Sequence, residues 1–169
     1  MNILTIGGSD TSSGAGIQSD IKMFSNNGFY PFTVITAITS QNTKKITSIE
    51  PVSMRSLESQ MESVLSDFHI DAAKIGMVFN SQNIKTIHSK LKNSKFPIVV
   101  DPIIKSTTGR LLLKRNALPD YRKMIIPLAD VITPNRYESK VLTGLTDVRK
   151  AAKKNANHGC KKCNHHWIH

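Results

Sequence analysis

The sequence predicts an α/β fold with a mainly parallel sheet. Short apolar segments that suit strands alternate with longer segments in which apolar residues recur every three or four positions, as in amphipathic helices. Repeated strand and helix units joined by right-handed crossovers give a parallel sheet with helices on both faces. The 169 residues, of which 39% are hydrophobic, are enough for one domain with a core.

Local signals set the boundaries of these elements. Gly28 ends the first helix as a C-terminal glycine, and Ser53 belongs to the residue types favoured as N-caps. Residues 31–40 are almost continuously β-branched or apolar, which is typical of a strand covered on both faces. Residues 117–128 keep a helical pattern despite two prolines. The expected elements are, in chain order, strand 2–6, helix 15–27, strand 31–40, edge strand 45–50, helix 54–68, strand 72–75, helix 81–91, strand 97–100, a mostly helical stretch 117–128, strand 130–133 and helix 135–142.

The character of the chain changes after residue 147. Residues 149–169 contain six basic residues and no acidic one, and residues 155–169 have almost no apolar periodicity. We therefore expect residues 1–148 to form the folded domain and residues 149–169 to be a basic tail outside the core, although residues 149–154 could begin one more helix.

The formal charge of +11 raises the question of a nucleic-acid partner. Residues 1–148 hold 17 basic and 12 acidic residues, so much of the excess lies in the tail. The other lysines are scattered over predicted helix surfaces, which favours a solvated surface over nucleic-acid binding. No apolar run reaches the roughly 18 residues of a membrane span, and no export signal precedes the first strand, so we expect a cytoplasmic protein.

The tail also holds a group of potential zinc ligands. Cys160 and Cys163 are followed by His165, His166 and His169. Zinc sites usually place their two ligand pairs well apart in the sequence, and one loop that carries all of them is poor geometry. Without an export signal, a disulfide between the cysteines is also disfavoured.

Residues 7–20 join the first strand to the first helix through a loop that contains four glycines. Glycine permits positive φ and a close approach of another molecule, and the helix N-terminus that follows favours a polar or anionic ligand. The loop matches neither the dinucleotide-binding pattern nor the P-loop, so a plain tight turn is an equal alternative. Asp20 is the stronger sign of function, because it lies beside the apolar stripe of the helix, where an acid seldom stands without a partner.

Small or polar residues follow nearly every predicted strand. Ligands of open α/β sheets bind beyond the carboxyl ends of the strands, so these residues outline one cleft. Gln41 offers a donor and an acceptor to the edge of a heterocycle, unless it faces water. Met77 offers an apolar contact, unless it only packs in the core. The strand exits are Gly7-Gly8, Gln41-Asn42, Gly76-Met77, Asp101-Pro102 and Asn135.

Asn135 and Glu138 have the spacing N-x-x-E at the start of the last predicted helix. One interpretation is a capping box that only satisfies the first turn of the helix. The other places Glu138 in a water shell around Mg²⁺ near nucleotide phosphates, since this cation prefers oxygen ligands. The two interpretations are compatible.

Taken together, these segments resemble the hydroxymethylpyrimidine/phosphomethylpyrimidine kinases of thiamine biosynthesis, which belong to the ribokinase-like superfamily. The resemblance runs from the N-terminus to about Gly144. It implies a ribokinase-like three-layer αβα sandwich with a mainly parallel central sheet. The segments that carry it are Gly8-Ser9-Asp10, Gly14 to Asp20, Thr36 to Thr43, Lys74 to Met77, Val100-Asp101-Pro102, and Thr133-Pro134-Asn135 with Glu138.

The resemblance implies ATP-dependent phosphorylation of the 5-hydroxymethyl group of 4-amino-5-hydroxymethyl-2-methylpyrimidine, then of the resulting monophosphate, with ATP and Mg²⁺ as cofactors. It also implies hydrogen bonds from Asp20 and Gln41 to the substrate. Asn135 and Glu138 would lie at the nucleotide, with Glu138 linked to the metal. The residues that would line the aminopyrimidine pocket are Gly8, Ala15, Asp20, Gln41 and Met77.

Two features depart from the family pattern. Lys105 is displaced relative to Gly109, so it is given no role. The family's Gly-Thr-Gly-Cys loop, an anion hole with a catalytic cysteine, does not occur in these 169 residues, and Cys160 is not its equivalent, so no catalytic residue is assigned. We therefore expect a sandwich whose C-terminal part is missing, through truncation or a frameshift near residue 155, and little turnover by the isolated chain.

Other interpretations stay open. A related ribokinase-like kinase could act on pyridoxal or a sugar, and a non-catalytic module could bind nucleic acid or metal through the basic tail. A homo-oligomer, or a partner chain that completes the ATP site, is compatible with the kinase interpretation.

Overall fold

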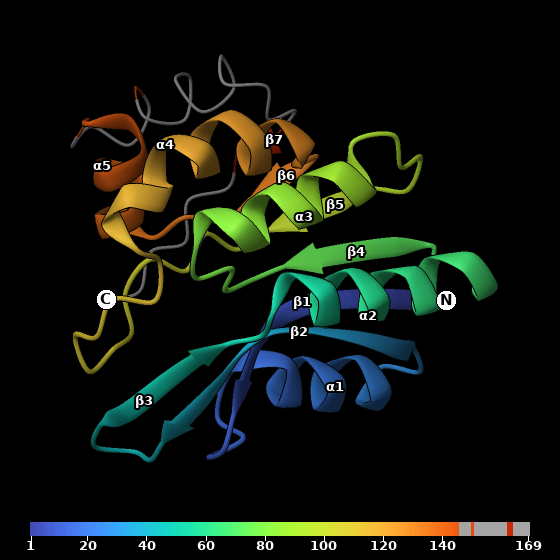
Figure 1. Ribbon diagram of the computed structural model, residues 1–169, viewed down its shortest axis with the longest axis horizontal. Coiled ribbons are helices and arrows are strands. Elements are labelled where there is room, and N and C mark those ends of the chain that lie inside the picture. Colours follow the sequence, from blue (N-terminus) through green and yellow to red (C-terminus); the bar gives the residue numbers. More distant parts are fainter. Residues whose placement is uncertain (146–149, 151–161, 164–169) are drawn as a thin grey trace.

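The computed structural model describes residues 1–145, Lys150 and the backbone of Lys162 and Cys163 (Figure 1). Within these residues the sheet order is β3-β2-β1-β4-β5-β6-β7, with β3 antiparallel to β2 and the other neighbours parallel. This confirms the predicted α/β fold with a mainly parallel sheet. The strands are β1 (Asn2–Asp10), β2 (Tyr30–Gln41), β3 (Ile46–Pro51), β4 (Ala72–Ile75), β5 (Ile98–Val100), β6 (Val131–Ile132) and β7 (Lys162–Cys163).

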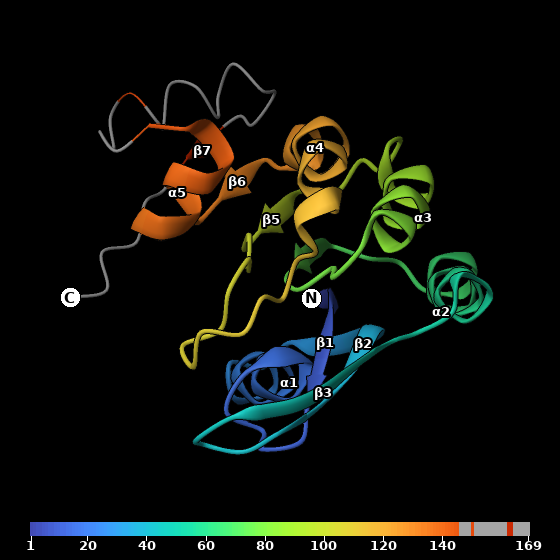
Figure 2. The same ribbon diagram turned by 60° about the vertical axis from the view of Figure 1, so that its left-hand side comes forward.

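Helices cover both faces of this sheet. Figure 2 shows α2, α3 and α4 side by side over one face, with α1 and α5 over the other. The main apolar core includes Leu4 and Ile6 of the central strand together with Leu57, Met61 and Ile84 of the helices. The helices are α1 (Gly16–Asn26), α2 (Met54–Asp67), α3 (Ser81–Leu91), a helical stretch from Arg115 to Leu128 that contains α4 (Leu118–Asp120), and α5 (Arg136–Thr143).

The stretch from Arg115 to Leu128 is helical but irregular. It passes through a 3-10 turn, α4, a π-helical turn at Tyr121–Ile125 and a second 3-10 turn. Proline lacks a backbone N–H, and Pro119 and Pro127 both lie in the first positions of such a turn, where a missing donor costs little. The two prolines therefore divide the helix without ending it.

The structure differs from the sequence expectations at two places. β1 continues to Asp10, because residues 7–10 keep pairing with β2 across a bulge instead of turning away after Ile6. Lys162 and Cys163 pair in parallel with β6, so the expectation that residues 155–169 lie outside the folded core is wrong for this dipeptide. Strand pairing uses backbone groups and needs no apolar periodicity, which explains the error. Apart from Lys150, the possible helix at residues 149–154 lies outside the described residues.

Within residues 1–145, no helix is both long enough and apolar enough to cross a membrane. This finding agrees with the lack of a long apolar run in the sequence.

A side chain from α2 completes the hydrogen bonding beside the β-bulge in β2. The register passes from Gly7 opposite Ile35 to Gly8 opposite Ala37, which leaves Thr36 as the extra residue. Gln60 accepts a hydrogen bond from the Ile35 N–H at 2.8 Å and donates one to the Ile35 carbonyl at 3.1 Å. Both backbone groups of Ile35, the residue before the bulge, are therefore satisfied by a side chain.

We expect Gln60→Leu to lower the free energy of unfolding by about 2 kcal/mol, because both backbone groups of Ile35 lose their partner in a partly buried setting. Urea denaturation measures this loss. Arg55→Leu, at an exposed position of the same helix, is the matched control and should change stability by no more than about 0.5 kcal/mol. Equal losses in the two variants would contradict the role given to Gln60.

Candidate functional site

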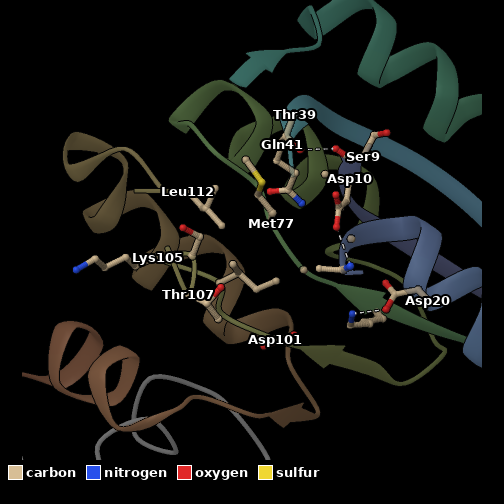
Figure 3. Close-up of a pocket in the computed structure, with 18 of the residues that line it drawn as sticks. Ser9, Asp10, Asp20, Thr39, Gln41, Met77, Asp101, Lys105, Thr107 and Leu112 are labelled. Carbon is tan, nitrogen blue, oxygen red and sulfur yellow. Dashed lines mark hydrogen bonds and ion pairs between the residues drawn. The ribbon is translucent and has the colours of Figure 1, made fainter. Parts of the chain in front are cut away.

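A cleft of about 670 Å³ opens at the carboxyl edge of the sheet. It is lined by residues from the ends of β1, β2 and β4, from the first turns of α1 and α5, and from the loop after β5. Figure 3 shows side chains from these separate segments facing a common space. The lining includes all seven residues selected from the sequence: Gly8, Ala15, Asp20, Gln41, Met77, Asn135 and Glu138.

Asp10 organises the glycine-rich loop from its centre. One carboxylate oxygen accepts hydrogen bonds from the Ser12 N–H and hydroxyl, each at 2.7 Å, and the other accepts the Ala15 N–H at 2.8 Å. Burial by itself raises the pKa of Asp10, but hydrogen bonds from Gln41, Ser12 and the Ala15 backbone outweigh it and lower that pKa. Asp10 was missed as a site residue, and its place within the glycine-rich segment 7–20 was the available signal.

The loop brings the first turn of α1 into contact with the end of β1. Gly16 has φ +61°, and a Cβ there would lie 2.4 Å from the carbonyl oxygen of Gly8. Gln18 fastens the same two segments, since it accepts from the Asp10 N–H at 2.8 Å and donates to the Ser9 hydroxyl at 2.7 Å. Only a residue without a side chain fits at position 16, so the glycine has a structural reason beyond a simple turn.

Gln41 and Met77 lie on the opposite side of the loop from α1. The backbone of Gln41 is fixed by Thr11, whose hydroxyl donates to the Gln41 carbonyl at 2.8 Å and accepts from its N–H at 2.9 Å. Met77 packs with Ala37 and Leu112 in a small apolar cluster and also lines the cleft, so it does not serve the core alone. In Figure 3 the two side chains point into the cleft next to Asp10.

Asp20 is held by residues of two neighbouring strands. Its carboxylate accepts from the Lys74 ammonium at 2.5 Å and from the Thr5 hydroxyl at 2.6 Å. Lys74 lines the cleft with Asp20. The partner expected for an acid beside an apolar stripe is therefore present. Sequence reasoning missed Lys74 as a site residue, because only strand pairing brings it beneath α1.

Asn135 and Glu138 form the capping box of α5. The Asn135 side chain accepts from the Glu138 N–H at 2.9 Å, and Glu138 accepts from the Asn135 N–H at 2.9 Å. Glu138 is buried, with 4% of its surface exposed. Burial is the main cause that raises the pKa of Glu138 to about 7, and the charge of Asp101 adds to it against hydrogen bonds from Asn135 and Ile104.

Lys105 and the possible zinc ligands of the tail are the remaining candidates. Lys105 lines the cleft, but its ammonium points away from Asp20 and Gln41 (Figure 3) and lies 5.7 Å from the centre of the Tyr137 ring. In the part of the chain that the structure describes, no three His, Cys, Asp or Glu side chains gather closely enough to enclose a metal. The proposed zinc ligands Cys160, His165, His166 and His169, and the side chain of Cys163, lie outside the described residues.

Comparison with known proteins identifies a family and several solved structures to which this chain is similar. The chain matches the phosphomethylpyrimidine kinase family over residues 10–165. It is 39% identical over 165 residues to the hydroxymethylpyrimidine/phosphomethylpyrimidine kinase of Haemophilus influenzae, covering 94% of this chain and 61% of that protein. The crystal structure of phosphomethylpyrimidine kinase from Clostridium difficile 630 has a TM-score of 0.93 at 39% identity, covering 100% of this chain and 76% of the other. The Staphylococcus aureus pyridoxal kinase in complex with AMP-PCP and pyridoxal has a TM-score of 0.81 at 32% identity, covering 94% and 59%.

The sheet and the cleft at its carboxyl edge define a protein of the ribokinase-like class. Within that class, the chain belongs to the phosphomethylpyrimidine kinase family. It spans about 61% of the length of the Haemophilus influenzae relative. The family match reaches residue 165, beyond both the limit near Gly144 that the motifs gave and the break expected near residue 155. Residues after Gly144 carry no distinctive motif, so motif comparison alone did not detect them.

We expect Gly16→Ala to lower the free energy of unfolding by about 3 kcal/mol, because the new Cβ meets the Gly8 carbonyl in addition to the cost of a positive φ. Chemical denaturation measures this loss. Gly28→Ala is the matched control, since Gly28 has φ +76° but nothing within 4 Å of the place that a methyl group would take, and it should lose about 1 kcal/mol. A similar loss in both variants would show that the contact with Gly8 is unimportant.

The raised pKa of Glu138 predicts a specific pH dependence of stability. Between pH 4.5 and about 7 the folded protein keeps the Glu138 proton while the unfolded chain releases it, so this residue makes the unfolding free energy fall as the pH rises. Gln at the third helical position keeps a capping box but cannot titrate. From pH 5 to pH 8, Glu138→Gln should therefore gain on the order of 2 kcal/mol relative to wild type in urea denaturation.

Glu50→Gln, at an exposed site on β3, provides the control for this comparison and should follow the wild-type pH dependence. Parallel pH curves for wild type and Glu138→Gln would mean that the carboxyl of Glu138 is not perturbed.

Proposed function

We propose that this protein takes part in thiamine biosynthesis by phosphorylating 4-amino-5-hydroxymethyl-2-methylpyrimidine, and then its monophosphate, with ATP. One observation carries the proposal: the seven residues selected by family motifs, which come from five separate segments of the chain, line one cleft. Membership of the phosphomethylpyrimidine kinase family supports the choice of substrate.

The pyrimidine end of the cleft lies between β1, α1 and the ends of β2 and β4. A Cβ at Gly8 would lie 2.8 Å from the Met77 sulfur, so the glycine leaves the thioether free to face the cleft. A thioether makes favourable contacts with a flat ring, and Ala15 adds only a small side chain. Asp20 and Gln41 then supply the hydrogen bonds that orient the ring and its 5-hydroxymethyl group.

The nucleotide end is assigned to the first turn of α5. Related pyridoxal kinases have been solved with ADP and with the ATP analogue AMP-PCP, which supports ATP as the phosphoryl donor. Mg²⁺ fits here, because the Glu138 and Asp101 carboxyls are near enough for the charge of Asp101 to raise the pKa of Glu138. Mg²⁺ is usually bound through one or two carboxylates, water and phosphate oxygens.

In this assignment Glu138 would hold a Mg²⁺ ion through water, beside the helix start that Asn135 caps. The ion, when bound, supplies neutralisation of charge on the transferred phosphoryl group. Phosphoryl transfer depends mainly on positioning and electrostatic stabilisation, so the contribution of this chain is to hold the hydroxymethyl group of the substrate in a fixed place.

Pyridoxal is the second candidate substrate. It is favoured by the TM-score of 0.81 to the Staphylococcus aureus pyridoxal kinase in complex with pyridoxal. Its ring is also a flat nitrogen heterocycle with a hydroxymethyl group, but it lacks the amino group of the pyrimidine. Binding measurements with both compounds separate the two candidates.

Calorimetry with the 169-residue chain tests the proposed function. We expect 4-amino-5-hydroxymethyl-2-methylpyrimidine to bind, and Gln41→Ala to weaken its affinity about tenfold through the loss of one hydrogen bond. Gln82→Ala, at an exposed position on α3 outside the cleft, is the matched control and should bind like wild type. Absence of binding by the wild type, or tighter binding of pyridoxal, would contradict the proposed substrate.

A further inference from the structure

Two neighbouring strands of the sheet, β1 and β4, together fix the carboxylate of Asp20. Thr5 of β1 and Lys74 of β4 are direct partners in the parallel register, so their side chains emerge next to each other beneath α1. The Lys74 ammonium donates to one oxygen of Asp20 and the Thr5 hydroxyl donates to the other. Thr5 is fully buried, and the side chains of Lys74 and Asp20 are 24% and 13% exposed.

This arrangement determines whether a ligand group that meets Asp20 must be a hydrogen-bond donor or an acceptor. An ammonium group only donates hydrogen bonds, and here the Thr5 hydroxyl also donates. A carboxylate with a donor on each oxygen has lone pairs left but no hydrogen to give. Any ligand group that reaches Asp20 in the cleft must therefore be a donor, and an acceptor placed there would meet an unpaired negative oxygen.

Gln41 carries both a donor and an acceptor, and its side chain already hydrogen-bonds to Asp10. Asp10, the other acid at this end of the cleft, already accepts hydrogen bonds from Ser12 and Ala15 within the loop. The donors that hold Asp10 lie within its own loop, whereas those that hold Asp20 come from two strands of the sheet, so Asp20 is the acceptor that the sheet itself fixes in the cleft.

We propose that Lys74 and Thr5 are positioning residues that set the specificity of the cleft for an amino-substituted heterocycle, by holding Asp20 as a hydrogen-bond acceptor for the amino group. The inference rests on the proposed function and adds to it the substituent that is recognised and the residues that impose the choice. Lys74 is also the cation that makes a largely buried carboxylate acceptable at this place.

Removing the positive charge should change selectivity as well as affinity. Without the Lys74 donor, Asp20 keeps only the hydrogen bond from Thr5, so its carboxylate can rotate and no longer presents a fixed acceptor to an amino group. If Lys74 served only to stabilise the fold, its substitution would weaken the binding of both ligands equally.

The experiment measures by calorimetry the affinities of 4-amino-5-hydroxymethyl-2-methylpyrimidine and its 4-oxo analogue. In the wild type we expect the amino compound to bind at least tenfold more tightly. In Lys74→Met and in Lys74→Gln, which keeps a polar group for the fold, the ratio should fall below about threefold. Lys74→Arg retains the cation and should preserve a ratio above about fivefold. Lys85→Met, at an exposed position on α3, is the control and should leave the ratio unchanged.

The outcomes separate the two proposals. If the wild type binds the amino compound but the ratio is below threefold, or if the neutral variants keep the wild-type ratio, the role of Lys74 is refuted while the proposed function stands. If the wild type binds neither compound, both are refuted. The wild-type ratio needs no variant, so misfolding of a substituted chain leaves this part of the test intact.

Discussion

The close approach between the end of β1 and the first turn of α1 positions the pyrimidine end of the cleft. At Gly16 the two backbones come so near that a methyl group would lie 2.4 Å from the Gly8 carbonyl. Asp10 closes the loop between them, and Gln18 fastens it from the helix. With α1 fixed in this way, Asp20, one turn further on, is placed over Thr5 and Lys74. If the loop were longer or bulkier, the carboxylate would not reach both strands.

The bulge in β2 helps to position the side of the cleft that lies away from α1. Thr36 is the extra residue, and its hydroxyl donates to the Met77 carbonyl at 2.6 Å, while Asn83 donates to the Thr36 carbonyl at 2.9 Å. These bonds tie β2 to the exit of β4 and to α3. Met77 is thus held at the cleft by a hydrogen bond from Thr36, while Thr11 fixes the backbone of Gln41.

The two ends of the cleft differ in their electrostatics. At the pyrimidine end the charge of Asp20 is balanced by Lys74 within hydrogen-bond distance, which suits a neutral heterocycle. At the other end Glu138 is largely cut off from water, and this burial is the main cause that raises its pKa, with the charge of the nearby Asp101 adding to it. Under the proposed function, the neighbouring carboxyls at this end would suit a cation that accompanies phosphates, and the cleft would hold a neutral substrate apart from a charged nucleotide.

The sequence by itself determined the order of strands and helices, the parallel sheet and the residues at the strand exits. Those features depend on local periodicity, capping residues and the rule that ligands bind at the carboxyl edge. Only the tertiary structure decided that β1 runs on to Asp10, that Lys162 and Cys163 add a strand, and that Lys74 pairs with Asp20. The reason is physical: strand register brings together Thr5, Lys74 and Asp20, which are far apart in the chain, and no spacing within one segment encodes such a contact.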